Sequence, residues 1–503
     1  MYYNLQKPRA TYNLNLPNLN SQSFFFHSSL LIDENLRSRI RSSRGLSFRS
    51  SLRSKLRRQI FLPLGLLLIP FYSSHALTSQ TTRNHIQGSA PYFVYKNVGA
   101  SILAVDTDGL LSIAFNNGVQ YTPSTNTSSS SAPIVLPIAN QPVSGIHMFI
   151  PVDKDSVEFS MLGWKDDDGD TDVTATGTLS LSVTDKYNRA VPRDRTLGPC
   201  GAPYRLKLTS TNGNLSTRYG VPRSRSFNAS TVTYYVTPNP DTEPEVCFAK
   251  PVLVADKEKN AGPASIWNPY KGFFTHNKPE FYDRNFPTTG ANNMYFDLEI
   301  AGNSQLLAWS SVTRGGITAT VGNFTPTSVR ITLTGPVATA SQWNSSNPGL
   351  IAKPTLPQTF ELIGHYVHNG KKAVKYGFEI KQWFVNRGKA YYTYPSMESW
   401  CNKIGYRMPT VKDLTNAKRY EVTGATPSSS GDYYQRRIGA SFIAEWGDLS
   451  KYEKADFGTN WFWTNVITPS NEYNRFIVHP DDGHTHWAYI GSAVTSVGLC
   501  TYP

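Results

Sequence analysis

An acidic tract in the sequence offers oxygen ligands for a hard cation. Residues 165–172 read Lys-Asp-Asp-Asp-Gly-Asp-Thr-Asp, with five aspartates within seven positions. Ca²⁺ prefers carboxylate and carbonyl oxygens, so the tract is a candidate calcium site. Its candidate ligands are Asp166, Asp168, Asp170 and Asp172. It is not an EF-hand, because position 173 is valine and no glutamate closes the loop. A solvated loop tip is the alternative interpretation.

A second tract combines imidazole and carboxylate groups. Residues 479–487 read His-Pro-Asp-Asp-Gly-His-Thr-His-Trp. These donors suit Zn²⁺, and His484 and His486 fall on one face of an extended segment. A polar exposed loop with incidental histidines is the alternative interpretation.

Motifs for catalysis are missing from the sequence. It contains no G-x-S-x-G, no H-E-x-x-H and no glycine-rich phosphate loop. Its cysteine, histidine and asparagine residues show no spacing typical of a catalytic set. We therefore expect a binding protein rather than an enzyme.

Aromatic side chains are also candidates for contacts with a partner, because they dominate the energetics of binding interfaces. We expect contacts from loops near residues 431–437, 446–456 and 479–487. The candidate ligand-binding residues are Tyr433, Tyr434, Arg436, Trp446, Tyr452, His484 and His486.

The first 76 residues have the order of a secretory signal. Nine lysines or arginines lie between Arg37 and Arg58, the apolar run Ile60–Tyr72 follows, and small residues occupy Ser74 and Ala76. The apolar run has 13 residues, whereas a membrane-spanning helix needs about 20. We expect cleavage after Ala76, no transmembrane segment in the mature chain, and a secreted or cell-surface location. An uncleaved membrane anchor is the alternative interpretation of the apolar run.

Net charge argues against a nucleic-acid partner. The whole chain carries +13, but residues 1–76 hold 11 basic and 2 acidic residues. The remaining chain has 38 basic and 34 acidic residues, a net charge of only +4. Most of the basic excess would leave with the leader, so no nucleic acid is expected to bind.

Four cysteines predict two disulfides in an exported chain. They are Cys200, Cys247, Cys401 and Cys500, and three pairings are possible. The pairing Cys200–Cys247 with Cys401–Cys500 is favoured, because each bridge then stays within one expected domain.

Apolar residues alternate with polar ones before residue 396, which is typical of antiparallel β-sandwiches. The alternating sets are Leu179, Leu181 and Val183; Leu206 and Leu208; Val329, Ile331 and Leu333; and Val374, Tyr376, Phe378 and Ile380. The polar residues Lys375, Glu379 and Lys381 point the other way, which predicts a half-buried strand.

Capping signals predict two helices in the C-terminal part. The first covers Met397–Ile404, with Ser396 as a candidate N-cap. The second runs from Val411 to about Tyr420 and follows a capping-box pattern of Thr410 and Asp413. The expected strands are Ser441–Trp446, Asn460–Val466, Arg475–Val478, Trp487–Ile490 and Val494–Leu499.

The C-terminal part also resembles a known type of domain. Residues 400–410 read Trp-Cys-Asn-Lys-Ile-Gly-Tyr-Arg-Met-Pro-Thr, and Trp446-Gly447-Asp448 and Asn460–Thr464 follow before Cys500. This order resembles the C-type-lectin-like domain of bacterial invasin- and intimin-like adhesins. With the preceding strands, the resemblance to enterobacterial adhesion-domain proteins extends over residues 270–503.

The resemblance implies a mostly β chain, with tandem immunoglobulin-like or β-sandwich domains followed by an α+β C-type-lectin-like domain. The expected divisions are a basic leader and signal peptide (1–76), an N-terminal β-sandwich domain (77–272), an immunoglobulin-like β-sandwich domain (273–386) and the C-type-lectin-like domain (387–503).

The resemblance also implies an exported adhesin-like protein whose tip recognises a host or cell-surface protein or glycan. One alternative is a secreted effector exported through a separate invasin-like outer-membrane barrel. Another is an enzyme of the formylglycine-generating type, which shares the phrase Cys-x-x-x-Gly-x-Arg-x-Pro-Thr. The triplets that bind sugar through Ca²⁺ in animal C-type lectins, Glu-Pro-Asn and Gln-Pro-Asp, are missing from the sequence.

Overall fold

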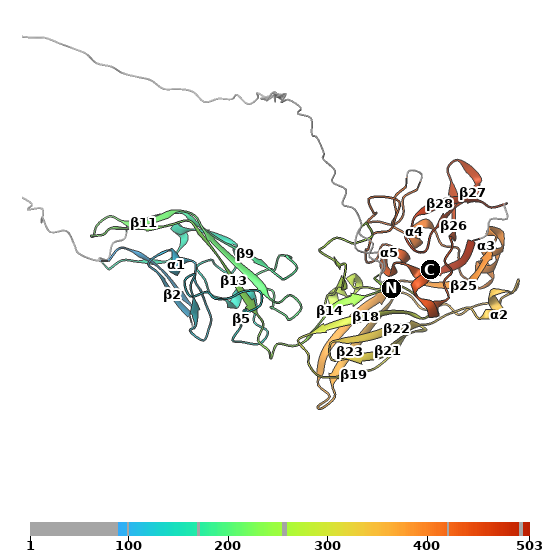
Figure 1. The fold of residues 1–503 in the computed structure, drawn as a ribbon, viewed down its shortest axis with the longest axis horizontal. Coiled ribbons are helices and arrows are strands. Elements are labelled where there is room, and N and C mark those ends of the chain that lie inside the picture. The colour runs from blue at the N-terminus through green and yellow to red at the C-terminus, as the bar shows by residue number, and fades with distance from the viewer. Residues whose placement is uncertain (1–88, 98–99, 168–171, 254–258, 420–421, 492–495) are drawn as a thin grey trace, which may run out of the picture. The chain divides into compact units, whose positions relative to one another are not determined.

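Three successive β-rich segments make up the part of the chain that the computed structural model describes (Figure 1). The described residues are 89–97, 100–167, 172–253, 259–419, 422–491 and 496–503. The chain is mostly β, as the sequence predicts. The expected leader, 1–76, lies outside the described residues. Within them, no helix has both the length and the apolar character needed to span a membrane.

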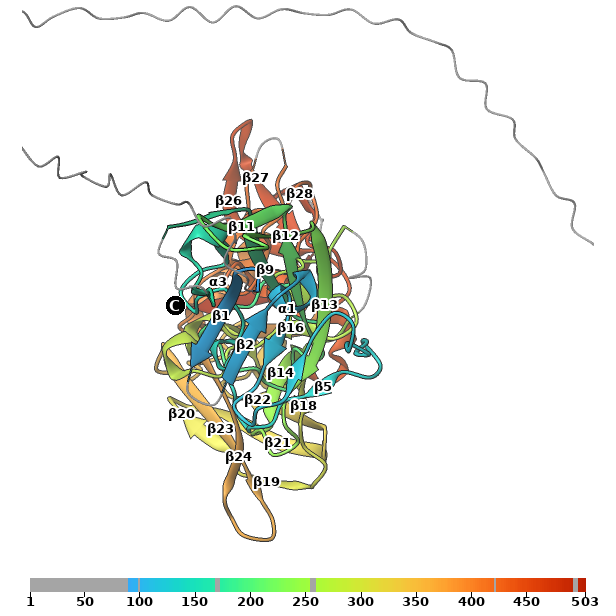
Figure 2. The same cartoon turned by 90° about the vertical axis from the view of Figure 1, so that its left-hand side faces the viewer.

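The first β segment, residues 89–244, is built on the alternation seen in the sequence. Leu179, Leu181 and Val183 on β9 and Leu206 and Leu208 on β10 are all buried in one core. The antiparallel register pairs Leu206 with Val183 and Leu208 with Leu181, so apolar residues face the same side. The main sheet has the order β5-β13-β10-β9-β6. In a smaller sheet β1 and β2 lie side by side (Figure 2).

The elements of the first β segment are β1 (Tyr92–Asn97), β2 (Ala100–Ala104), α1 (Thr107–Leu110), β3 (Ile113–Ala114), β4 (Gln120–Tyr121), β5 (Ile134–Val135), β6 (Ser156–Glu158), β7 (Trp164–Lys165), β8 (Val173–Thr176), β9 (Thr178–Thr184), β10 (Tyr204–Ser210), β11 (Gly213–Thr217), β12 (Ser224–Phe227) and β13 (Ser230–Thr237).

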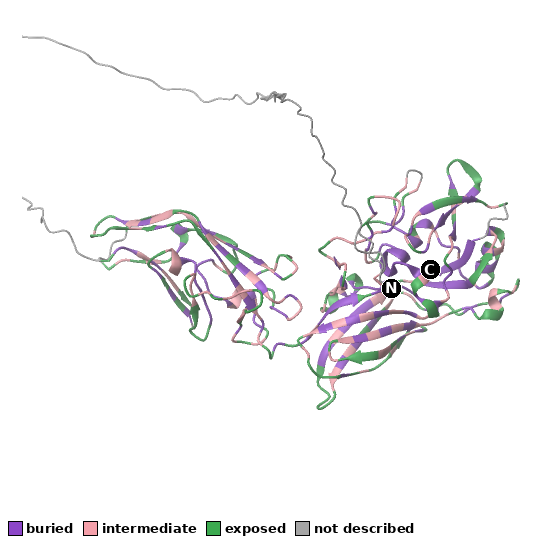
Figure 3. Ribbon diagram, in the orientation of Figure 1, coloured by how far each residue is buried: buried purple, intermediate pink, exposed green. Residues whose placement is uncertain are grey.

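The central segment, residues 245–381, packs a seven-stranded sheet against a three-stranded one. The strand orders are β15-β16-β14-β18-β22-β21-β20 and β19-β23-β24. Phe296 of the larger sheet lies 5.8 Å, centroid to centroid, from Phe378 of the smaller sheet. Tyr376, Phe378 and Ile380 are buried, while Lys375 and Glu379 are partly exposed, so the predicted half-buried strand is confirmed. Figure 3 shows this alternation along the strands.

The elements of the central segment are β14 (Glu245–Lys250), β15 (Trp267–Asn268), β16 (Gly272–Phe274), a 3₁₀ turn (Pro279–Arg284), β17 (Thr289–Ala291), β18 (Met294–Ala301), β19 (Leu307–Trp309), β20 (Val312–Arg314), β21 (Ile317–Thr325), β22 (Ser328–Thr334), α2 (Ala340–Trp343), β23 (Gln358–Tyr366) and β24 (Lys372–Ile380).

The C-terminal segment, residues 382–503, shares its sheet and its core with the central segment. The sheet order is β17-β25-β29-β26-β27-β28, and β17 pairs in parallel with β25 through Gly290 and Trp383. One hydrophobic cluster runs through both segments. Strand β25 continues across residue 386, where the sequence predicts a domain boundary, and β14 lies before the predicted boundary at residue 272. The division into domains stays a prediction.

The elements of the C-terminal segment are β25 (Gln382–Tyr392), α3 (Tyr394–Lys403), α4 (Val411–Leu414), α5 (Phe442–Trp446), 3₁₀ turns at Leu449–Lys451 and Glu453–Ala455, β26 (Phe462–Thr468), β27 (Asn471–Val478), β28 (Thr485–Tyr489) and β29 (Ser496–Tyr502).

Both predicted helices exist, but with different ends. Helix α3 begins at Tyr394 after Thr393, and Ser396 lies inside it instead of capping it, because Pro395 already fits the first turn. The Thr410–Asp413 capping box is present, yet α4 ends at Leu414 instead of continuing to Tyr420. The Thr415 side chain accepts a hydrogen bond from the backbone N–H of Ala417, which favours a turn over another helical turn.

The predicted strand Ser441–Trp446 is wrong, because Phe442–Trp446 forms helix α5. The Ser441 hydroxyl accepts a hydrogen bond from the backbone N–H of Ala444, as an N-cap does. All five helical residues are buried, so no polar face reveals the helical period in the sequence. The other predicted strands overlap β26, β27, β28 and β29.

Asp413 supplies a pH-dependent part of the stability of this capping box. It accepts hydrogen bonds from Arg407 Nη1 at 2.7 Å, from the Thr410 backbone N–H at 2.6 Å and from Gln382 Nε2 at 2.8 Å. Burial by itself raises the pKa of Asp413, but these hydrogen bonds outweigh it and hold the pKa below its usual range. A lowered folded-state pKa stabilises the fold above the unfolded value of about 3.9, and this contribution is lost as the pH falls through the folded-state pKa.

We expect Asp413→Asn to lower the free energy of unfolding by about 1–2 kcal/mol at pH 6, and the difference from wild type to shrink below about pH 4. Urea denaturation at pH 6 and pH 3 measures both values. The control is Asp172→Asn, whose ion pair with Arg218 is exposed and should contribute almost nothing. A difference that stays constant down to pH 3 would contradict the assigned role of the Asp413 charge.

Candidate functional site

The structure describes only part of the acidic tract proposed for Ca²⁺. Asp168 and Asp170 lie outside the described residues. Asp166 is partly buried, and Asp172 is exposed and pairs with Arg218 at 3.4 Å. Calcium binding at Asp166, Asp168, Asp170 and Asp172 therefore stays a prediction.

Four of the predicted ligand-binding residues are buried, so their assignment as surface contacts is corrected. They are Tyr434, Arg436, Trp446 and Tyr452. The Trp446 indole N–H donates to the Thr289 carbonyl at 3.0 Å, and the Tyr452 hydroxyl accepts from the Val252 N–H at 3.1 Å. These contacts bind the C-terminal segment to the central segment, and the side chains have no surface to offer a partner.

Arg436 is a fully buried arginine whose guanidinium group makes its contacts inside the protein. Its Nη1 donates to the Glu445 carbonyl at 2.5 Å, and its Nη2 donates to the Val252 carbonyl at 2.7 Å. Its guanidinium lies 4.8 Å from the ring centroid of Trp267. Arginine suits this position because its planar group donates in several directions and stacks on an aromatic ring.

A buried carboxylate, Glu445, holds the same junction. It accepts hydrogen bonds from the backbone N–H and hydroxyl groups of Thr288 and Thr289 and from the backbone N–H of Gly439. The two hydroxyl contacts are 2.6 Å long. Burial raises the pKa of Glu445, and the hydrogen bonds from Thr288 and Thr289 oppose that rise.

The histidine tract forms the hairpin loop between β27 and β28. The His479 N–H donates to the His484 carbonyl at 3.0 Å, and the Gly483 N–H donates to the His479 carbonyl at 3.0 Å. Gly483 has φ of +69°, and a Cβ there would lie 2.7 Å from the Thr415 hydroxyl, so this close turn requires glycine. The hairpin brings His479 next to His484, whereas the sequence pattern had singled out His484 and His486.

Several contacts hold this loop against the rest of the segment. The Tyr434 N–H donates to the Asp482 carbonyl at 2.8 Å, and the Leu449 N–H donates to the Pro480 carbonyl at 3.1 Å. The first residue of β28, Thr485, donates from its N–H and its hydroxyl to Asp432. The loop is therefore positioned by the buried core beneath it.

Exposed rings lie on the two strands that flank this loop, β27 and β28, and define what we call the aromatic edge: Tyr473, His486, Trp487 and Tyr489. Tyr473 is 54% exposed, Trp487 44% and Tyr489 47%. The rings of Tyr473 and Tyr489 lie 6.4 Å apart, and those of His486 and Trp487 lie 5.8 Å apart. β28 is at the edge of its sheet, beside β27 (Figure 1).

Sequence reasoning selected His486, and the expected contact loop 479–487 includes Trp487, but Tyr473 and Tyr489 were not selected. The alternating pattern around residue 487 does not show which rings are exposed. Their exposure depends on the position of β28 at the edge of its sheet. Among the remaining predicted contacts, Tyr433 and His484 are partly exposed. Tyr433 lies outside the aromatic edge, with its ring 5.3 Å from Lys259 Nζ.

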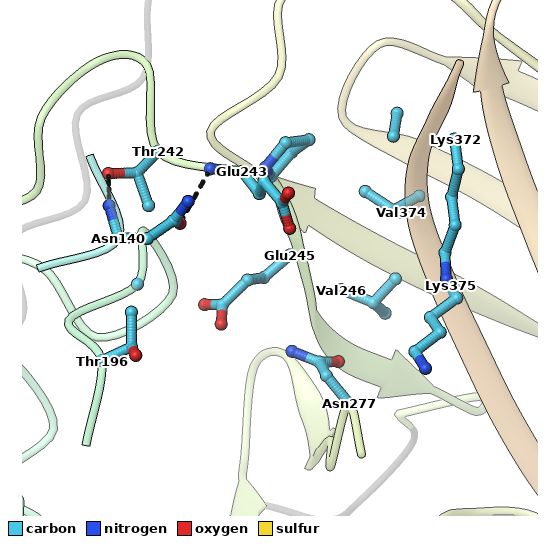
Figure 4. Close-up of a pocket in the computed structure, with 13 residues that line it drawn as sticks. Asn140, Thr196, Thr242, Glu243, Glu245, Val246, Asn277, Lys372, Val374 and Lys375 are labelled. Atoms are coloured by element: carbon cyan, nitrogen blue, oxygen red, sulfur yellow. Dashed lines mark hydrogen bonds between the residues drawn. The ribbon is translucent and has the colours of Figure 1, made fainter. Parts of the chain in front are cut away.

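A pocket of about 350 Å³ lies elsewhere, and the partly buried carboxylate of Glu245 lines it (Figure 4). This carboxylate is held by the Cys200 backbone and the Asn277 side chain, and burial raises its pKa. The hydrogen bonds drawn in Figure 4 link Asn140 to Thr242 and to Glu243. Asn140, Thr242 and Glu245 are thus engaged in structural contacts, and we do not place the candidate site there.

Both favoured disulfides are present. Cys200–Cys247 ties the first β segment to β14, and Cys401–Cys500 ties α3 to β29. The second bridge is fully buried. Since β29 pairs with β26, which pairs with β27, the bridge anchors the sheet that carries the aromatic edge.

No protein-family model matches the chain. Over 111 residues the chain is 28% identical to the inverse autotransporter adhesin YeeJ of Escherichia coli (strain K12). The match covers 22% of this chain and spans only 4% of that relative's length.

Two solved structures also align with the chain. Invasin, a bacterial integrin-binding protein, aligns over 66% of this chain and 51% of its own, with 14% identity and a TM-score of 0.32. A C-terminal 282-residue fragment of intimin, solved with the intimin-binding domain of the translocated intimin receptor, aligns over 66% of this chain and 100% of its own, with 10% identity and a TM-score of 0.30. In sequence, the part of this chain that matches YeeJ is similar to an adhesin.

Proposed function

We propose that the chain is an exported bacterial adhesin-like binding protein whose aromatic edge contacts a protein or glycan on a host or neighbouring cell. The observation that carries this proposal is a set of exposed rings on a firmly anchored sheet edge. The local sequence similarity to an E. coli adhesin supports the same class of function.

The physics of binding favours this edge over the loops selected from sequence. Aromatic side chains contribute large contact areas with few rotatable bonds, so they dominate the free energy of many interfaces. Here Trp487 and Tyr489 stand on a strand whose start is fixed by Asp432 and whose sheet is held by the Cys401–Cys500 bridge. A rigid platform loses little conformational entropy when it binds.

The rings of the aromatic edge limit which chemical groups of a partner can bind there. An apolar or aromatic side chain of a partner protein can pack on them, and the face of a sugar ring can stack on them. Tyr433 and His484 stay candidate contacts near this edge.

We expect the double variant Trp487→Ala/Tyr489→Ala to bind target cells or a purified partner at least about 30-fold more weakly, the scale of a lost hot spot. Flow cytometry with the labelled full chain on mammalian cells, followed by a glycan array, measures the change. The matched control is Phe324→Ala, which removes another ring that is 50% exposed, on β21.

Two results would contradict this assignment of the surface. Binding that is unchanged in the Trp487→Ala/Tyr489→Ala variant would move the contact surface away from the aromatic edge. An equal loss of binding in Phe324→Ala would show that removing any exposed ring weakens binding.

The C-type-lectin-like fold of residues 387–503 and the export route belong to the same proposal. A bridge from the first helix to the last strand supports the fold assignment. For export we propose a signal peptide within residues 1–76 and a separate outer-membrane barrel as the carrier. Cell fractionation tests the outcome: retention at the cell surface supports an adhesin, and release into the medium supports a secreted effector.

A further inference from the structure

The loop between β27 and β28 gathers metal-binding groups directly before the aromatic edge. In the part of the chain that the structure describes, His479, Asp482 and His484 each offer one ligand atom, and these atoms all lie within 4.8 Å of one another. His484 Nδ1 lies 2.5 Å, and His479 Nδ1 3.8 Å, from the same oxygen, Oδ1 of Asp482.

We propose that His479, Asp482 and His484 form a binding site for one divalent transition-metal ion, with Zn²⁺ as the ion of choice. Two imidazoles and one carboxylate form a donor set that suits Zn²⁺. Ca²⁺ and Mg²⁺ prefer sites made only of oxygen ligands, so the two imidazoles disfavour them.

The rings are already close to a binding arrangement before any ion arrives. His479 and His484 are stacked with centroids 5.1 Å apart and 26° between their planes. Both pack edge-on against Trp461, at 5.0 Å and 4.5 Å. Rings held by packing lose little freedom when they bind an ion, which favours affinity.

The surroundings of the site resemble the outer shell of a metal centre. The Asp482 carbonyl accepts a hydrogen bond from the Tyr434 N–H at 2.8 Å, which fixes the backbone of this ligand. Partners of this kind orient the ligands of metal sites. His479 is 22% and His484 34% exposed, so an ion can enter from solvent.

Three protein ligands leave the fourth position of a tetrahedral ion for water or for a group from outside the chain. The site lies at the start of β28, directly before His486 and Trp487 of the aromatic edge. An ion there would link the two ends of the hairpin loop, directly before the strand that carries those rings.

Calorimetric titration with Zn²⁺ tests the site in the full chain, purified without a histidine tag and treated with chelator. We expect one Zn²⁺ per chain and a Tm that rises with Zn²⁺. In His479→Ala/His484→Ala the affinity should fall at least about 10-fold. His368→Ala, which removes an exposed histidine from the β23–β24 turn, should bind like wild type.

Further variants separate this site from its neighbours. His486→Ala should keep wild-type affinity, because His486 is not among the grouped ligands. An equal loss in His486→Ala would overturn the assigned ligand set, and no binding by wild type would overturn the site itself. If the double histidine variant fails to fold, Asp482→Asn takes its place, and undiminished Zn²⁺ binding by that variant would also overturn the proposal.

Discussion

Replacing Glu445 by alanine is expected to lower the free energy of unfolding by about 3–5 kcal/mol. The substitution leaves five donors without their acceptor: the buried N–H and hydroxyl groups of Thr288 and Thr289, and the N–H of Gly439. A buried donor that loses its partner costs the full free energy of desolvation. Chemical denaturation of the full chain measures the loss.

The matched control for this prediction is Glu453→Ala. Glu453 is an exposed glutamate of the same segment, and its removal should change stability by no more than about 0.5 kcal/mol. A Glu445→Ala protein as stable as this control would show that water replaces the carboxylate, and that the junction does not depend on it.

The hydrogen bonds of Glu445 also determine which form of the protein is suitable for binding experiments. Thr288 and Thr289 belong to the central segment, so a fragment that begins at residue 387 lacks most of the donors that Glu445 requires. It also divides β25 and exposes a core that the two segments share. For this reason the binding experiments above use the full chain.

Removing the Cys401–Cys500 bridge is expected to lower the free energy of unfolding by about 4–5 kcal/mol on the chain-entropy model. The two cysteines are 99 residues apart, so the bridge restricts a large part of the unfolded chain. Thermal and urea denaturation of Cys401→Ala/Cys500→Ala measure the loss. Hydrogen exchange should increase most in α3 and β29, the two elements that the bridge joins.

The comparison for this variant is Cys200→Ala/Cys247→Ala, which opens a loop with a sequence separation of 47. The chain-entropy model assigns that bridge only about 0.6 kcal/mol less, but the faster exchange should then appear near β14. If a Cys401→Ala/Cys500→Ala protein resists heat and protease as well as wild type does, the bridge does not contribute to stability.

Much of the β-structure follows from local information in the sequence. The alternation in β9, β10, β22 and β24 sets which side chains are buried, because successive residues of a strand point to opposite faces. The Thr410–Asp413 capping box could be predicted for a related reason: donor and acceptor lie three residues apart, so the hydrogen bonds form within one turn.

The candidate site could be predicted from the sequence only in part. Tyr434, Arg436, Trp446 and Tyr452 belong to residue types that dominate binding surfaces, yet they are buried at the junction with the central segment. Their partners include Thr289 and Val252, more than 150 positions earlier in the chain. No local pattern encodes contacts at that separation.

The sequence by itself determined the strand-rich character of the chain, the capping of α4 and the residues available for two disulfides. Only the tertiary structure decided that Phe442–Trp446 is a helix, that Trp487 and Tyr489 are exposed, and that His479 lies beside His484. The physical reason is the range of the interactions. Strand alternation and caps depend on neighbours within a few residues, whereas burial and side-chain grouping depend on which distant segments the fold brings together.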